Sequence, residues 1–215
     1  MSRDSDPPDL TVRLAQPDDA DRLASLMFAA PSREAVAMAG SARAAERFQT
    51  SLFRDTLRTG TSVIIVAETT SGLAGLAQVS QGGDSPPFLT LARAAVGSMG
   101  LGGALRAAHR ASARAKVDLS APEGGVHLVE LQVAPDLRGR GIGAFLLARV
   151  DEHAIAENAR NISLTTATDN PARRLYERHG YRLTDQRTDA RYQQITGSEG
   201  RVLMVKPLPT DGGAA

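Results

Sequence analysis

The sequence predicts an α/β fold, in which helices pack against a mixed sheet. Three observations support this prediction. An apolar segment, Val126–Val133, leads through a glycine-rich loop into a helical pattern. Two strand-like segments, Ser62–Glu68 and Leu73–Ser80, are joined by a short turn, as in a hairpin. Strand and helix patterns then alternate up to a last strand at Val202–Lys206.

The composition bounds the class of protein. A chain of 215 residues is long enough for one domain with a sizeable core. We expect this domain over residues 10–208, with polar tails at 1–9 and 209–215. The absence of cysteine excludes disulfides, cysteine nucleophiles and thiolate zinc sites. The net charge of +1 gives no electrostatic sign of a nucleic-acid partner, and none is expected.

Targeting signals are missing from the sequence pattern. It contains no uninterrupted run of about eighteen apolar residues, the length that a membrane-spanning helix needs. The polar N-terminus also lacks the apolar centre of a signal peptide. We therefore expect a cytoplasmic protein with no membrane partner. The sequence leaves open whether the protein forms a homodimer.

The first half of the chain begins with a strand and two helices. Leu10–Ala15 alternates apolar and polar residues, as a half-buried strand does. Pro17, followed by two aspartates, starts a helix whose apolar face extends to Phe28. Ala42–Arg58 carries aromatic and aliphatic residues at helical spacing and is the second expected helix. The hairpin follows it.

A helical insertion is expected between the hairpin and the central strand. After a breaker at Gly82–Pro87, the segment from 88 to 118 indicates two helices broken around Gly97–Gly103. Its second helix carries Arg106, Arg110 and Arg114 on one face. This face either forms a lid over an acidic substrate or cofactor phosphates, or is the solvated side of a surface helix.

The second half of the chain completes the sheet. The helix after the glycine-rich loop extends to Asn158 and is followed by a strand at Ile162–Thr166. A further helix is expected at Pro171–His179 and a strand at Tyr181–Asp185. Val202–Lys206 closes the sheet.

The glycine-rich loop is the most specific local signal. Gly139, Gly141 and Gly143 remove every second side chain, so a ligand can approach the backbone closely. The free N–H groups of the following helix point toward this loop and, with the helix dipole, attract anions. Arg138 and Arg140 add positive charge. The loop therefore indicates a pyrophosphate or a similar polyanion.

Two segments also carry a family resemblance. Arg138-Gly-Arg-Gly-Ile-Gly143 is similar to the Arg/Gln-x-x-Gly-x-Gly/Ala signature of the GNAT superfamily of acyl-CoA-dependent N-acyltransferases. Asn170-Pro-Ala-Arg-Arg-Leu-Tyr-Glu-Arg-His-Gly-Tyr181 resembles its Asn-x-x-Ala/Ser…Leu-Tyr-Glu-x-x-Gly-Phe segment, with Tyr181 in place of Phe. The resemblance implies a twisted, mostly antiparallel sheet of six or seven strands flanked by helices.

A dinucleotide-binding fold is the competing interpretation of the same glycines. Gly139-Arg-Gly-Ile-Gly-Ala144 also fits the Gly-x-Gly-x-x-Gly/Ala fingerprint. However, its first glycine lies several residues beyond the strand end at Val133, and no acidic residue ends the strand Ile162–Thr166. These departures favour the GNAT interpretation.

The resemblance implies which residues bind acetyl-CoA. The pantetheine arm would contact backbone groups of Leu131, Gln132 and Val133, and the pyrophosphate would lie on the loop formed by Arg138, Gly139, Arg140, Gly141, Ile142 and Gly143. Asn170 would be a further contact, although it can equally be a helix cap. Arg173 either reaches the phosphates or is solvated.

Two residues are candidates for the chemistry. Tyr176 matches the family tyrosine that protonates the departing thiolate; the alternative is a core tyrosine whose hydroxyl has a partner. Glu130 is the candidate base, or else has a structural or substrate-anchoring role. In a regular strand it shares a face with Val126, Leu128 and Gln132, and burial there would raise its pKa. His127 would then lie on the other face, as a structural residue.

The resemblance thus implies direct transfer of an acetyl group from acetyl-CoA to an amine, without a metal. The pattern of residues leaves the identity of the acceptor open. A binding module that senses acyl-CoA without turnover is the alternative function.

Overall fold

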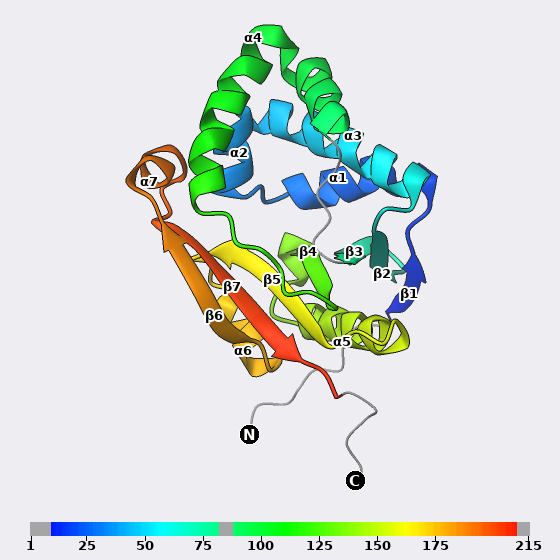
Figure 1. Ribbon diagram of the computed structural model, residues 1–215. Helices are drawn as coiled ribbons and strands as arrows, with labels where there is room; N and C mark the ends of the chain where they lie inside the picture. Colours follow the sequence, from blue (N-terminus) through cyan, green and yellow to red (C-terminus); the bar gives the residue numbers. More distant parts are fainter. Residues whose placement is uncertain (1–9, 82–87, 210–215) are drawn as a thin grey trace.

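The computed structural model describes residues 10–81 and 88–209, so the sequence predictions for residues 1–9, 82–87 and 210–215 lie outside the described residues. A sheet of seven strands crosses this part of the chain, in the order β1-β2-β3-β4-β5-β7-β6 (Figure 1). Its strands are β1 (Thr11–Leu14), β2 (Val63–Thr69), β3 (Gly72–Gln81), β4 (Val126–Val133), β5 (Asn161–Ala167), β6 (Arg182–Thr188) and β7 (Gly200–Pro207).

The sheet is mixed but mostly antiparallel, which confirms the predicted fold class. Only β4 and β5 pair in parallel, and every other neighbouring pair of strands is antiparallel. The predicted hairpin is β2 and β3, which turn at Thr69–Gly72. A parallel pair needs a crossover connection, and α5 supplies it between β4 and β5.

Seven α-helices accompany the strands within the described residues. They are α1 (Ala20–Phe28), α2 (Arg33–Ala39), α3 (Ala42–Thr59), α4 (Phe88–Lys116), α5 (Ile142–Ala156), α6 (Arg173–Arg178) and α7 (Ala190–Thr196), with short 3₁₀ turns at Pro17–Asp19 and Pro135–Leu137. Of these, α2 and α7 were not predicted from the sequence. The predicted break in the insertion is confirmed by a kink in α4 at Gly100, whose φ is 69°.

Two apolar cores lie on the two faces of the sheet. On one face, Leu146, Leu147 and Val150 of α5 and Tyr176 of α6 pack with residues of β3, β4, β5 and β7. On the other face, α1 and Phe53 of α3 pack against β2 and β3. The molecule therefore has three layers, and α2, α4 and α7 extend the helical layer beyond α1 and α3 (Figure 1).

Candidate functional site

The two parallel strands separate to form a wedge in the middle of the sheet. β4 and β5 pair only from Val126 with Ile162 to Leu128 with Leu164. β4 then continues to Val133 without a partner on the β5 side among the described residues. Backbone N–H and C=O groups need hydrogen-bond partners when they are covered. The Arg138 Nε donates to the Val133 carbonyl at 3.2 Å, but this side of β4 has no partner strand beyond Leu128 and can bind an extended polar ligand. The predicted pantetheine contacts Leu131, Gln132 and Val133 lie in this stretch.

A β-bulge at Val129 interrupts β4 at the point where the wedge opens. Glu130 pairs with Gln78 and Leu128 with Val79, so Val129 is an extra residue on this strand. An extra residue moves every later side chain to the opposite face of the sheet.

The bulge corrects two predictions from the sequence. Leu131 and Val133 pack in the same core as Val126 and Leu128, so the even-numbered residues beyond the bulge lie on the other face. The amide of Gln132 accordingly donates a hydrogen bond to the Met27 carbonyl, at 3.1 Å. The prediction that Glu130 shares a face with Val126 and Leu128 was wrong, although it does share one with Gln132.

Glu130 lines two adjoining hollows on this second face, of about 400 and 720 Å³. His127 lines the larger one too, so the prediction that it faces away from Glu130 was also wrong. The hollows have six lining residues in common, contributed by the start of α2 and by β4, β5 and β7: Ser32, Glu34, Val129, Glu130, Thr165 and Arg201.

Glu130 is the stronger base of the two titratable groups that β4 places there. Burial raises the pKa of Glu130 to about 7, with Arg201 opposing the rise and Glu34 adding to it. Burial and the charge of Arg201 lower the pKa of His127 to about 4. The imidazole is therefore neutral at pH 7, and its Nδ1 lies 2.9 Å from the Ser163 hydroxyl. A base with a pKa near the working pH is the more effective proton acceptor.

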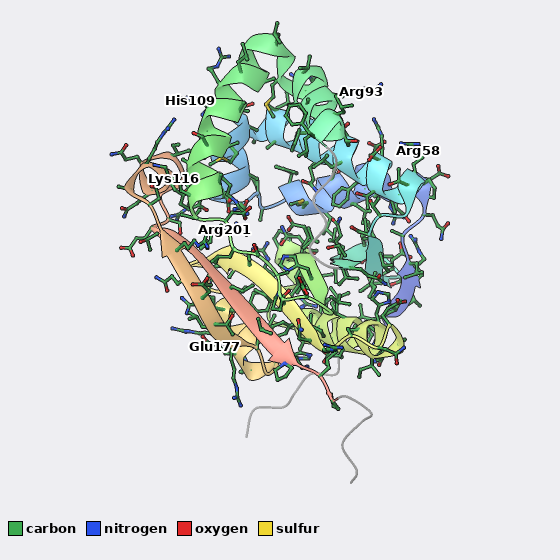
Figure 2. The ribbon with its side chains drawn as sticks, in the orientation of Figure 1. Arg58, Arg93, His109, Lys116, Glu177 and Arg201 are labelled. Carbon is green, nitrogen blue, oxygen red and sulfur yellow. The ribbon has the colours of Figure 1, made fainter. Side chains whose placement is uncertain are left out.

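An ion-pair network closes the helical side of the hollows. Glu34 of α2 binds Arg201 of β7 at 2.5 Å and the Arg114 Nε at 2.8 Å. Arg201 also donates to the Thr165 carbonyl at 3.0 Å. Figure 2 shows Arg201 where the sheet meets the helical layer. Of the three arginines that the sequence placed on one helix face, Arg114 alone lines these hollows, and Asp118 pairs with it.

Tyr176 of α6 lies in the core beside the wedge. Its ring packs edge-on against Tyr181, with centroids 5.9 Å apart, and the residue is only 7% exposed. Burial and the charge of Glu130 raise the pKa of Tyr176 to about 12, so the hydroxyl keeps its proton at neutral pH. None of the side-chain hydrogen bonds found in the described part of the chain engages this hydroxyl. Tyr176 lies in the core on one face of the sheet and Glu130 on the other face, so the open wedge between β4 and β5 is where both could act on one ligand.

The glycine-rich loop has the backbone geometry of an anion site. Gly139 and Gly141 have φ angles of 77° and 81°, which glycine adopts without strain. The first hydrogen bond of α5 runs from the Phe145 N–H to the Gly141 carbonyl, at 2.9 Å. The preceding N–H groups of the first turn are therefore free of helical acceptors, and the exposed Arg138 and Arg140 flank them.

Gly143 and Ile142 have packing roles in this segment. A Cβ at Gly143 would lie 2.9 Å from the Leu175 side chain, so glycine allows α5 to pack against α6. The Ile142 side chain is buried in the core, which leaves only its backbone for a ligand.

The side chains of Asn170 and Arg173 bind the protein's own backbone. Asn170 accepts a hydrogen bond from the Ala172 N–H at 2.9 Å and donates one to the Thr166 hydroxyl at 2.6 Å. It therefore holds the turn that leads into α6, whose N-cap is Ala172. Arg173 donates to the Thr168 carbonyl at 2.7 Å. Asn170 also lines the smaller hollow. Contact of either residue with acetyl-CoA stays a prediction.

No cluster of three or more metal-ligating side chains occurs in residues 10–81 and 88–209.

Replacing Glu130 by glutamine is expected to stabilise the protein at alkaline pH. Folding raises the pKa of Glu130 from 4.5 to about 7, so the folded state holds a proton that the unfolded state has lost between these values. The free energy of unfolding of the natural protein therefore falls as the pH rises through this window, by up to about 3 kcal/mol. Glutamine does not titrate. Urea unfolding should show that the free energy of unfolding of E130Q, relative to that of the natural protein, is higher at pH 8 than at pH 4. An equal difference between the two proteins at both pH values would contradict the raised pKa of Glu130.

Comparisons with known proteins agree with the fold and the two motifs. The family model of the acetyltransferase (GNAT) family matches residues 37–181, which is more than half of the chain. A sequence comparison with curated proteins finds no match.

Solved structures show the same fold at low sequence identity. An acetyltransferase structure aligns with a TM-score of 0.61 at 20% identity, covering 93% of this chain and 100% of the other. An acetyltransferase from Thermus thermophilus aligns with a TM-score of 0.54 at 17% identity, covering 95% and 100%. The PaiA N-acetyltransferase from Thermoplasma acidophilum, in complex with coenzyme A, gives 0.51 at 13% identity, covering 93% and 99%. On the family match, this chain belongs to the GNAT family of acetyltransferases and is an acyltransferase.

Proposed function

We propose that the protein is an N-acetyltransferase that moves the acetyl group of acetyl-CoA directly to an amine while both substrates are bound. The observation that carries this proposal is the open wedge between β4 and β5, which has Glu130 on one face of the sheet and Tyr176 on the other. Glu130 has a pKa of about 7, and Tyr176 is protonated. One group can accept the proton that the amine must lose, and the other can donate one to the departing sulfur.

The donor substrate would lie along the wedge. The N–H groups of the first turn of α5 and the arginines Arg138 and Arg140 would hold its pyrophosphate. The open side of the Leu131–Val133 backbone would hold the pantetheine arm, which directs the thioester toward Tyr176. The arm would displace the Arg138 Nε from the Val133 carbonyl. The hollows lined by Glu130 would then receive the acceptor from the opposite side.

The proposed transfer balances without a covalent enzyme intermediate. The acceptor nitrogen forms a bond to the thioester carbonyl carbon, and the carbon–sulfur bond breaks. Glu130 takes the proton of the nitrogen, directly or through water, and the Tyr176 hydroxyl gives its proton to the sulfur. Exchange with solvent then restores both groups. Freeing an amine with a pKa near 10.4 at pH 7 costs about 4–5 kcal/mol, which explains the need for a base.

Release of the CoA thiol in the presence of a panel of amines tests this function. The expected result is thiol release that depends on the amine, beyond the hydrolysis seen without acceptor. Calorimetric titration with acetyl-CoA is run in parallel. Binding without amine-dependent release for any amine would favour the acyl-CoA sensor instead.

Gly141→Val is expected to weaken acetyl-CoA binding by about ten- to a hundredfold, the cost of one or two lost hydrogen bonds to a charged group. Valine strains the φ of 81° at this position and fills the space next to the free N–H groups of α5. Gly60→Val is the matched control, because Gly60 also has a left-handed φ and open space around it but ends α3 on the other face of the sheet. If calorimetry gave the two variants equal affinities for acetyl-CoA, the pyrophosphate could not be assigned to this loop.

A further inference from the structure

Helix α4 forms an arm that projects from the body of the molecule. It runs outward from α3, bends at Gly100 and returns toward α7 (Figure 1). The bend is the part of the helical layer farthest from the sheet in this view. Both segments are anchored, since Ala94 is buried in the first, while Ala113 of the second packs in a core with Tyr192. The bend itself has no such anchor.

Large apolar side chains are exposed around this bend. Val96, Leu101 and Leu105, which we call the α4 crest, are 44%, 69% and 65% exposed. Among the described residues, α4 is the one helix that is long and apolar enough to cross a membrane, and only 6% of its most apolar stretch is buried. Arg93 interrupts this stretch, so it contains no uninterrupted run of eighteen apolar residues. Exposed apolar surface of this kind marks an interaction site.

Positive charge lies directly beside the crest. A groove of about 540 Å³ between α4 and the start of α3 is lined by Arg43, Arg47, Arg106 and Arg110, which we call the arginine groove. No carboxylate lines it within the described residues, and none of the four arginines is in an ion pair among them. Arg110 donates to the Met38 carbonyl at 3.3 Å. The groove also contains Val96, so the crest and the groove are continuous.

The sequence of α4 reinforces this charge. Its 29 residues include no aspartate or glutamate. The first segment carries Arg93, and the second carries Arg106, His109, Arg110, Arg114 and Lys116. Arg93 and His109 lie on the outer sides of the two segments, as Figure 2 shows. Two copies of α4 placed together would bring like charges face to face, so self-association through this arm is electrostatically unfavourable.

We propose that the bend of α4 docks on an anionic membrane surface, with the crest in the headgroup region and the arginine groove on lipid phosphates. An apolar edge bordered by arginines is the pattern of a segment that lies in a membrane interface. Because both segments of α4 are anchored in the folded domain, the arm lies on the membrane and does not span it. This proposal departs from the expected lack of a membrane partner, and it does not depend on the proposed acetyltransferase activity.

Co-sedimentation of the full chain with lipid vesicles tests the proposal. We expect binding to vesicles of phosphatidylcholine mixed with phosphatidylglycerol, weak binding to phosphatidylcholine alone, and loss of binding at high salt. Leu101→Ser combined with Leu105→Ser should lower the partition coefficient at least about tenfold, because two exposed leucines no longer enter the interface. Arg106→Gln should lower it about fivefold, the contribution of one arginine near an anionic surface.

Two matched variants control for a general loss of surface apolarity or charge. Ile155→Ser removes an exposed aliphatic side chain from the end of α5, and Arg58→Gln removes a charge from the far end of α3. Both should bind as the natural protein does. Failure of the natural protein to bind anionic vesicles would overturn the proposal. So would equal binding by the crest variant, or a dimer in light scattering that the crest variant converts to a monomer without any vesicle binding.

Discussion

Replacing Tyr176 by phenylalanine is expected to lower kcat by about 10²–10⁴-fold, the usual contribution of one general acid. The change keeps the ring, which packs edge-on against Tyr181, and deletes only the hydroxyl. None of the described side-chain hydrogen bonds uses this hydroxyl, so the cost in unfolding free energy should be small. KM for acetyl-CoA should stay nearly unchanged, because a general acid would act only on the departing sulfur. Steady-state kinetics with a saturating amine measure both constants.

Tyr181→Phe is the matched control for this experiment. The Tyr181 hydroxyl is buried without a hydrogen-bond partner in the described structure, and the residue lies in the same core. Its removal should therefore leave kcat unchanged and should not lower stability. Retention of more than about a third of the natural kcat by Tyr176→Phe, with chemistry rate-limiting, would exclude Tyr176 as the acid.

Replacing Glu130 by glutamine is expected to reduce kcat/KM by about 10²–10⁴-fold at pH 8, since glutamine cannot accept a proton. The pH profile gives a second signature. Glu130 must be ionised to act as a base, and its pKa is about 7, so kcat/KM of the natural enzyme should fall as the pH drops below this value. In E130Q this decrease of kcat/KM near pH 7 should disappear. Because the same variant is expected to gain stability at alkaline pH, loss of activity cannot be assigned to unfolding.

His127→Gln provides the comparison on the same strand. His127 lines the larger hollow with Glu130, but its pKa of about 4 keeps it neutral throughout the working range. This variant should keep the decrease of kcat/KM near pH 7 and most of the activity. If the decrease persisted in E130Q and disappeared in His127→Gln, the roles of the two residues would be exchanged.

Local patterns predicted the central strand, the glycine-rich loop and α5, because each is encoded by residue types within a short stretch of sequence. Val126–Val133 carries valine or leucine at five of its eight positions, which favours a strand in the middle of a sheet. The alternate glycines match a loop in which two of them adopt left-handed φ angles. The break in α4 followed in the same way from its cluster of glycines.

The face on which Glu130 lies could not be predicted from the strand itself. One extra residue at Val129 reverses the alternation, and nothing in the residue types of Val-His-Leu-Val-Glu-Leu-Gln-Val indicates where it falls. The bulge depends on pairing with β3, which is distant in the sequence.

The hollows lined by Glu130 were not predicted because they are assembled from several elements. Glu34 and Arg201 meet although 167 positions separate them, and no short motif contains both. The helix that carries Glu34 did leave a signal: Ser32 caps α2 through the Ala35 N–H, and Gly40 ends it with a φ of 89°. A search for a capping serine and a terminal glycine eight residues apart would have found it.

Direct acetyl transfer is tested most directly by a single-turnover reaction with isotope-labelled acetyl-CoA and a responsive amine, followed by mass spectrometry of the small molecules and of the intact protein. We predict one labelled amide for each CoA thiol released, an enzyme mass that stays unchanged throughout, and a rate that Tyr176→Phe lowers about 10²–10⁴-fold. Labelled protein that forms and decays at the rate of turnover would contradict direct transfer. Bound acetyl-CoA that yields no amide with any amine would contradict the enzymatic function.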